Sequence, residues 1–364
     1  MIIQDVITHL EAFSPLHYAE DFDNVGLLVG NREDHLTGAL ITLDTTEDII
    51  EEAIEKQCNL IISFHPIIFK GLKSLTGKNY VERIVIKAIK NNISIYSMHT
   101  ALDNAFQGVN AMILKKLNLK NPQILIPQKN TIKRLTTYVP KDNAETLRHA
   151  LFECGAGHIG NYSHCSFNVE GFGTFKGNES SNPKKGSKNT IHTEQEIQLT
   201  VIYQKHLEKN ILQKLFEIHP YEEVAYQITT LENKNQTVGM GMIGELETPL
   251  DELDFLTYLK TRMHTSCIKH SALLGKSVKK IAVLGGSGSF AIHEAKQQGA
   301  DVFITADLKY HDFFTAENRI LLADIGHYES EQFTKALLHE YLTKKITNFA
   351  VCLSSVNTNP VKYF

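Results

Sequence analysis

The stretch Ile325-Gly-His-Tyr-Glu-Ser-Glu331 lies at a predicted junction between a strand and a helix. The apolar run Ile320 to Ala323 precedes it and is typical of a buried strand, and the helix is expected to continue through Leu337. His327 and Glu331 are four residues apart, so a helix that begins by His327 places both side chains on one face. An imidazole and a carboxylate at such a junction provide half of a metal site.

Length and composition indicate the class of protein. A chain of 364 residues is longer than a domain with a single hydrophobic core usually is, so we expect two domains. The hydrophobic content of 42% and the charged content of 21% are those of a globular protein. A formal net charge of −4 gives no global electrostatic basis for nucleic-acid binding, so nucleic acid is not an expected partner.

The cysteines and the N-terminus indicate a compartment. The five cysteines are odd in number and lack short spacings, which favours reduced thiols in the cytoplasm. No apolar run approaches the length of a membrane span, and Asp5 and Glu11 interrupt the region where a signal peptide would be apolar. We therefore expect a cytoplasmic protein without a membrane partner.

Strands and helices alternate in the first and last thirds of the chain. In the first third, strands are expected at 39–43, 59–63 and 93–98, with helices at 46–55, 80–91 and 109–117. The alternation resumes after Gly239, with strands at 280–284, 302–305, 320–323 and 349–353. This pattern predicts a mostly parallel sheet that is covered on both faces. The fold class is therefore α/β, with two similar halves forming one core.

The middle of the chain follows another pattern. Strands are expected at 135–139, 197–203 and 223–229, helices at 144–153 and 206–216, and a Gly-rich turn at 154–162 that leads into a further strand. Residues 171–190 are rich in Gly, Ser, Asn and Lys and predict an exposed loop. Two strand–helix–strand units predict a ferredoxin-like α+β insert. We expect residues 1–131 and 236–364 to form the core, and residues 132–235 to form the inserted domain.

Three predicted strands each end on a histidine. His65 follows the strand at 59–63, His99 follows the strand at 93–98, and His327 follows the strand at 320–323. Asp103 comes four residues after His99. Carboxyl ends of parallel strands meet at one edge, so these side chains can converge. A His/Asp/Glu set without thiolates suits Zn, Mn, Fe, Co or Ni and leaves room for water. His99 could instead orient Asp103 or carry protons.

Three further motifs have two interpretations each. The Gly285-Gly-Ser-Gly-Ser289 loop could cradle a phosphate or simply form a turn, and it lacks the spacing of a dinucleotide or P-loop motif. Tyr310 and His311 could contact substrate or transfer protons, although a solvated helix start explains them equally well. The motif His219-Pro-Tyr-Glu-Glu223 has residue types common in metal sites, but Pro220 favours a shaped turn.

Several of these motifs resemble one known family over nearly the whole chain. The chain resembles the GTP cyclohydrolase I type 2 homologues, also called the NGG-one interacting factor three-like family, in its longer bacterial form. The resemblance rests on the segments 23–26, 64–70, 99–103, 285–289, 307–311, 326–331 and 356–360, and on 155–162 and 219–223 in the insert.

The resemblance implies a two-metal site between two α/β halves, a hexameric ring built as a trimer of dimers, and an insert similar to PII and CutA-type domains. By the matching motifs, the ligands are His65, Asp103, His327 and Glu331, with Glu331 as the bridge. The family usually has His-His-Pro where this chain has Phe64 before His65. A phenyl ring cannot coordinate a metal ion, so one ion would lose a ligand, which water or His99 could replace. The number of ions per subunit, one or two, therefore stays undecided.

These residues predict a metal-dependent hydrolase that uses metal-activated water. The substrate would be a small molecule or nucleotide, either in a reaction like that of GTP cyclohydrolase I type 2 or on a phosphate-bearing compound. His99, Tyr310 and His311 are the candidate catalytic residues. The alternative is a non-catalytic regulatory ring that binds metal or nucleotide, because PII-like domains mostly bind rather than catalyse.

Overall fold

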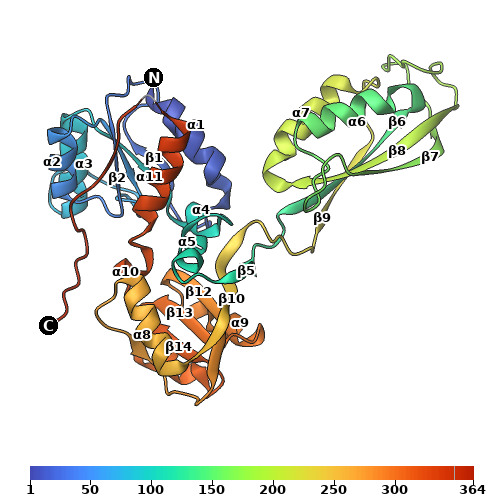
Figure 1. Cartoon of the computed structure of the whole chain (residues 1–364). Helices are drawn as coiled ribbons and strands as arrows, with labels where there is room; N and C mark the ends of the chain where they lie inside the picture. Colours follow the sequence, from blue (N-terminus) through green and yellow to red (C-terminus); the bar gives the residue numbers. More distant parts are fainter. Residues whose placement is uncertain (348) are drawn as a thin grey trace. The chain divides into compact units, whose positions relative to one another are not determined.

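The computed structural model describes residues 1–347 and 349–364, and the chain divides into two compact units. The core unit comprises 1–127 and 236–364, and the insert unit comprises 128–235 (Figure 1). The described residues form three sheets and eleven α-helices, which confirms the predicted mixed α/β class.

The first sheet of the core unit takes its last strand from the far end of the chain. Its strands lie in the order β1-β4-β3-β2-β15, with bounds β1 Gly26–Val29, β2 Ala39–Thr42, β3 Leu60–Ser63, β4 Ser94–Ser97 and β15 Val351–Leu353. Strands β4, β3, β2 and β15 are parallel, and β1 is an antiparallel edge strand. The C-terminal segment therefore completes the sheet that the N-terminal third begins.

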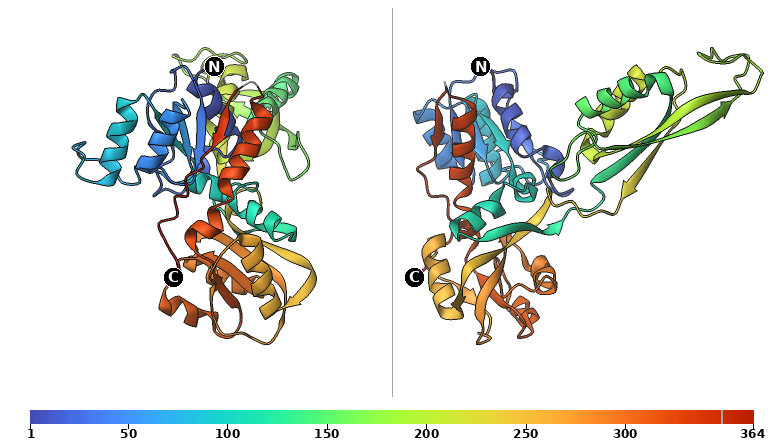
Figure 2. Two further views of the ribbon diagram at one scale, coloured as in Figure 1. Left: turned by 60° about the vertical axis from the view of Figure 1, so that its left-hand side comes forward. Right: turned by 45° about the vertical axis from the view of Figure 1, so that its right-hand side comes forward.

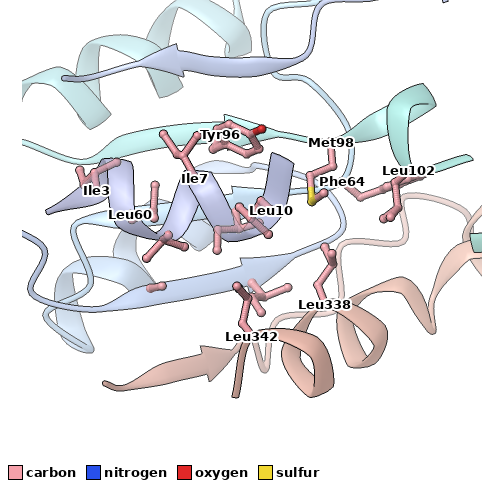
Figure 3. Close-up of a cluster of buried hydrophobic side chains, with 14 of the residues drawn as sticks. Ile3, Ile7, Leu10, Leu60, Phe64, Tyr96, Met98, Leu102, Leu338 and Leu342 are labelled. Carbon is pink, nitrogen blue, oxygen red and sulfur yellow. The ribbon is translucent and has the colours of Figure 1, made fainter. Parts of the chain in front are cut away.

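Helices cover both faces of this sheet, which explains why β2, β3 and β4 are buried throughout. One face packs against α1 (Ile3–Phe13) and α11 (Thr334–Lys345), and the other packs against α2 (Glu47–Glu55) and α3 (Tyr80–Lys90). Figure 3 shows the first of these clusters, in which α1 and α11 contribute Leu10 and Leu338. Alternate strand residues point to opposite faces, so each strand supplies both clusters.

The second sheet of the core unit combines parallel and antiparallel strands in the order β11-β14-β13-β12-β10-β5. Their bounds are β5 Lys120–Pro127, β10 Gly239–Asp251, β11 Lys269–His270, β12 Ser277–Ser287, β13 Val302–Ala306 and β14 Leu321–Asp324. Strands β12, β13 and β14 are parallel, and the other three pair antiparallel. Helices α5 (Val109–Lys116) and α8 (Glu252–Met263) pack on one face, and α9 (Ile292–Gln297) packs on the other.

The insert unit has one antiparallel sheet in the order β7-β8-β6-β9, with bounds β6 Ile132–Pro140, β7 Ser166–Phe175, β8 His192–Gln204 and β9 Tyr226–Leu231. Helices α6 (Ala144–Glu153) and α7 (Glu208–Ile218) cover one face of the sheet (Figure 2). The loop predicted at 171–190 was wrong at its start, because residues 171–175 pair with β8 as the end of β7. The glycines there belong to a strand.

A buried carboxylate ties the C-terminal segment to α2. Glu52 is 6% exposed and accepts hydrogen bonds from the Lys56 Nζ at 2.8 Å, the Ser354 Oγ at 2.5 Å and the Ser355 backbone N–H at 2.8 Å. Burial alone would raise the pKa of Glu52, but these hydrogen bonds outweigh it and lower the pKa to about 2. The carboxylate form is therefore the one that stabilises the fold.

We expect Glu52→Gln to lower the free energy of unfolding at pH 7 by about 1–3 kcal/mol, because buried donors lose a charged acceptor. The depressed folded-state pKa makes this contribution complete above the unfolded value of about 4.3 and lost as the pH falls toward 2. Urea unfolding at pH 7 and at pH 3 measures the effect. The exposed neighbour Glu55→Gln is the control, and a deficit that stays constant with pH would contradict the assignment.

Candidate metal centre

Three ligand atoms from the two sheets of the core unit converge on one point. The His65 Nε2 lies 3.2 Å from the Glu331 Oε2, the His327 Nε2 lies 3.3 Å from the same oxygen, and the two nitrogens are 3.4 Å apart. A tetrahedral ion with bonds of about 2.0–2.1 Å separates its ligand atoms by about 3.3–3.4 Å. This triangle therefore has the dimensions of one face of a tetrahedral site and could hold a metal ion.

The local fold explains how these side chains arrive. His65 follows β3, and His327 begins the short helix α10 (His327–Glu331) after β14. Gly326 has a φ of +93°, which lets the chain turn from strand to helix where a Cβ would be strained. Glu331 lies one turn further on the same helix, and its side chain is 3% exposed. The predicted shared face of His327 and Glu331 is thus present.

Each histidine is held by a carboxylate on its other ring nitrogen. The His65 Nδ1 lies 2.8 Å from the Asp44 Oδ1, and the His327 Nδ1 lies 2.6 Å from the Asp307 Oδ2. Asp44 also accepts a hydrogen bond from the Thr358 hydroxyl at 2.6 Å. A proton held on Nδ1 leaves the lone pair of Nε2 free to face an ion, as in many carboxylate–histidine–metal sites.

Asp44 and Asp307 were not among the predicted site residues. The signal that could have found them is a Thr-x-Asp sequence at the end of two parallel strands, Thr42-Leu-Asp44 after β2 and Thr305-Ala-Asp307 after β13. Helix α2 and strand β3 lie between Asp44 and His65. A 3₁₀ helix and strand β14 lie between Asp307 and His327. Conversely, carboxylates after strands are common, so spacing alone does not single out these two.

The charges in the cluster balance one another. Burial would lower the pKa of His65, but hydrogen bonds to Asp44 and Glu331 raise it to about 10. Burial would also lower the pKa of His327, but hydrogen bonds to Glu331 and Asp307 raise it to about 9. Burial would raise the pKa of Glu331, whereas the two imidazoles lower it to about 2. A divalent cation would take the place of the imidazole protons.

Asp103 lies next to this cluster rather than within its triangle. Its Oδ1 atom is buried and has no hydrogen-bond partner among the described residues. Burial, followed by repulsion from Glu331, raises the pKa of Asp103 well above its ordinary value. A buried carboxylate oxygen without a donor is costly unless a cation or a proton neutralises it. The orphaned oxygen therefore fits a metal ligand.

His99 borders the site and is fixed by a carboxylate other than Asp103. It begins the helix α4 (His99–Asn104), and its Nδ1 lies 2.8 Å from the Asp23 Oδ1. The Thr100 backbone N–H donates to the other Asp23 oxygen at 3.0 Å. The imidazole centroids of His99 and His65 are 5.4 Å apart, so His99 is close enough to serve the site.

Phe64 occupies the position where the resemblance leads one to expect a second histidine. Its side chain is 0% exposed and packs in the cluster with Met98 and Leu102 (Figure 3). Its ring centroid lies 4.9 Å from that of His65 and 5.7 Å from that of His99. Position 64 therefore contributes hydrocarbon to the core and no ligand atom.

The glycines at the end of β12 make room for Glu331, and the turn predicted at 285–289 was wrong at its start because β12 continues to Ser287. A Cβ on Gly286 would lie 2.5 Å from the Glu331 Oε1, and this glycine has a φ of +70°. Its backbone N–H donates to the Ser330 Oγ at 2.9 Å, and that of Gly285 donates to the Asn110 Oδ1 at 3.0 Å. These two N–H groups already have partners inside the protein, which argues against the phosphate-cradle interpretation.

Tyr310 and His311 do not join the cluster. They begin the 3₁₀ helix Tyr310–Ala316, where Tyr310 is 74% exposed and both rings contact Phe314. The hollow beside the cluster measures about 390 Å³ and is lined by residues that include His65, Asp307 and His327. Tyr310 lines a separate hollow. The structure thus brings His65, His327 and Glu331 together, places Asp103 and His99 beside them, and leaves Tyr310 and His311 apart.

The fold and the cluster define a class, namely α/β proteins that could hold a divalent metal ion where the two sheets of one core meet. The model of the Duf34/NIF3 (NGG1p interacting factor 3) family matches residues 1–360, and the chain belongs to this family. No helix among the described residues has the length and apolar character needed to cross a membrane.

Curated relatives and solved structures extend over the whole chain. A "GTP cyclohydrolase 1 type 2 homolog" of Bacillus subtilis (strain 168) is 35% identical over 99% of this chain and 98% of its own length. A homologue with the same name from Staphylococcus aureus (strain COL) is 35% identical over 100% of both chains. A Bacillus cereus protein related to NIF3 superposes with a TM-score of 0.84 at 34% identity, covering 100% of this chain and 99% of its own.

We expect Asp44→Asn and Asp307→Asn each to weaken binding of Zn²⁺ or Mn²⁺ by about 10- to 100-fold, because the imidazole loses the carboxylate that orients it. Both amides keep the size of the side chain, so folding should be little affected. Competition with a chromophoric chelator measures the affinity, and Asp48→Asn on the exposed face of α2 is the control. Affinities equal to that of the unmodified protein in both variants would refute the orienting role.

Proposed function

We propose that this protein binds a divalent metal ion through His65, His327 and Glu331, with Asp103 as a further ligand, and uses it to hydrolyse a small molecule. The observation that supports this proposal is the triangle of ligand atoms at 3.2–3.4 Å, in which both imidazoles are oriented by carboxylates. A bound divalent ion would polarise the scissile bond and lower the pKa of a coordinated water. The three ligands of the triangle leave a coordination position for that water, and with Asp103 as a fourth ligand the ion would be five-coordinate.

The surrounding residues have separate roles in this proposal. Asp44 and Asp307 hold the imidazoles in the orientation that exposes Nε2. His99, fixed through Nδ1 by Asp23, is the candidate to accept or deliver a proton at its Nε2. Tyr310 and His311 have no role here, since they contact Phe314 and Tyr310 lines another hollow. The name of the curated relatives makes purine nucleotides the first substrates to test, followed by phosphoesters.

Elemental analysis of protein purified without added metal tests the first half of the proposal, since it identifies the metal. A screen of GTP, other nucleotides and phosphoesters with added Mn²⁺, Fe²⁺, Zn²⁺ or Co²⁺ tests the second half. Saturable, metal-dependent turnover that disappears in a His65→Ala variant supports a hydrolase. Turnover by metal-free protein would refute it.

The second candidate is a regulatory protein that binds metal or nucleotide without turnover. It is supported by the insert unit, which has its own hydrophobic core apart from the metal cluster. We propose a ferredoxin-like fold for this unit, because the element order is strand–helix–strand–strand–helix–strand and the sheet order is β7-β8-β6-β9. Tight nucleotide binding without product formation would favour this candidate. Light scattering coupled to gel filtration tests the proposed hexamer.

Phe64→His tests whether Phe64 limits the number of ions. The substitution supplies the imidazole that the resemblance leads one to expect, so we expect the metal content per chain to rise by up to one ion. The metal-free variant should lose about 1–3 kcal/mol of stability, since a buried apolar ring is replaced by a polar one. Phe64→Leu is the matched control, which loses packing without gaining a ligand. Unchanged metal content in Phe64→His would show that Phe64 does not set the stoichiometry.

A further inference from the structure

The last three residues of the motif His219-Pro-Tyr-Glu-Glu223 line a second large hollow, which lies wholly within the insert unit. Buried His219 shapes the turn, because its Nε2 lies 2.9 Å from the Tyr138 carbonyl oxygen and its Nδ1 accepts the Tyr221 backbone N–H at 3.2 Å. The turn presents Tyr221 to a hollow of about 940 Å³, whose other walls are β7 and the loop that follows it. This volume suits a molecule of nucleotide or amino-acid size.

A buried carboxylate faces this hollow without a cationic partner. Glu196 on β8 lines the hollow, is 8% exposed, and forms no ion pair with a lysine or arginine within residues 1–347 and 349–364. The buried Tyr221 hydroxyl lies beside it, and burial and then this carboxylate raise the pKa of Tyr221. A carboxylate withdrawn from water needs a cation or several N–H donors to offset its desolvation. The Glu196 carboxylate is therefore available to a ligand.

The neighbouring strand β7 leaves space for this carboxylate. A Cβ on Gly173 of β7 would lie 2.0 Å from the Glu196 Oε2, so any larger residue would displace the carboxylate. A Cβ on Gly171, two residues earlier on the same strand, would have no atom within 4 Å. The close approach at Gly173 thus fixes where the carboxylate points.

The lining of the hollow also includes lysines, together with the acidic Glu170, Glu222 and Glu223. Lys176 and Lys184 line it, are exposed, and form no ion pair with a residue that the structure describes. Tyr138 and Phe175 add aromatic surface to the lining. A buried carboxylate and exposed ammonium groups in one lining match a molecule with a nitrogen-rich head and an anionic tail.

We propose that this hollow binds a small molecule that presents paired N–H groups to Glu196 and a negatively charged tail to Lys176 and Lys184. A guanidinium group and the Watson–Crick edge of guanine both present such a pair of N–H groups to a carboxylate. The site is separate from the metal cluster and does not depend on what that cluster catalyses.

Isothermal titration of the full-length protein with arginine and with GMP tests the proposal and separates its two chemical sources. We expect saturable binding of one of them, weakened about tenfold or more in Glu196→Gln, which removes the charge and keeps the shape. Gly173→Ala should weaken binding similarly. Gly171→Ala adds the same methyl group to the same strand and is the control for folding, which circular dichroism measures. Glu153→Gln, at an exposed position on α6, should bind like the unmodified protein.

The titrations with arginine and with GMP distinguish the two ligand classes. Binding of arginine alone assigns a guanidinium ligand, and binding of GMP alone assigns a guanine ligand. Binding that Glu196→Gln leaves unchanged overturns the proposal, as does the absence of binding of both probes at about 1 mM. Repeating the titration with His327→Ala keeps this result distinct from the metal site, because its binding should be unchanged.

Discussion

Replacement of His327 by alanine is expected to weaken divalent-metal binding by about 100-fold or more and to abolish any metal-dependent turnover. The variant removes one of three ligand atoms and leaves the buried Glu331 with a single imidazole partner. The side chain of His327 is 40% exposed, so its truncation creates no buried cavity, but the metal-free variant should lose some stability because the buried Glu331 keeps only one imidazole partner. Metal content after dialysis, measured by elemental analysis, and affinity, measured by chelator competition, report the effect.

The matched control is His293→Ala, since His293 is exposed on α9 and contacts Gln297 rather than the cluster. It removes an imidazole of the same type from the same unit. If both variants retain the metal content of the unmodified protein, His327 is not a ligand. If His327→Ala loses metal but keeps turnover, the metal is structural and the hydrolase proposal fails.

The convergence of histidines could be predicted because it follows from topology. In a parallel arrangement, residues that follow the strands share one edge, whatever the details of packing. His65 follows β3, His327 follows β14, and these two side chains do meet. The two halves of the core also correspond to each other. In each half, a histidine begins a short helix after the outermost parallel strand, and a carboxylate follows four residues later, as His99 with Asp103 and His327 with Glu331.

Other features were hidden because their sequences lack the expected periodicity. Strand β5 begins Lys-Asn-Pro-Gln and β10 contains three glycines, so neither has the apolar character of a central strand. Pairing between β5 and β10, over a separation that includes the entire insert, decides their structure. Tertiary context of this kind overrides local propensity.

Tyr310 and His311 show why a position after a strand is not sufficient. They follow β13, as expected for residues at the same edge as His327. Asp307, however, has a φ of +57° and uses its carboxylate to hold His327, and the chain then continues into an exposed 3₁₀ helix. The residue nearest the strand therefore reaches the site, while those three and four positions later contact each other.

Gly286→Ala is expected to weaken metal binding at least about tenfold, because the new methyl group would lie 2.5 Å from the Glu331 Oε1 and would displace that carboxylate. The φ of +70° adds a backbone cost of about 1–2 kcal/mol in stability. Gly299→Ala separates the two effects, since Gly299 has a φ of +71° and no atom within 4 Å of the place that an added methyl group would occupy. Both variants should lose similar backbone stability, measured by urea unfolding, but only Gly286→Ala should lose metal affinity. Equal metal affinities in the two variants would mean that Gly286 serves only the backbone conformation at the end of β12, and that Glu331 does not need the space which Gly286 leaves.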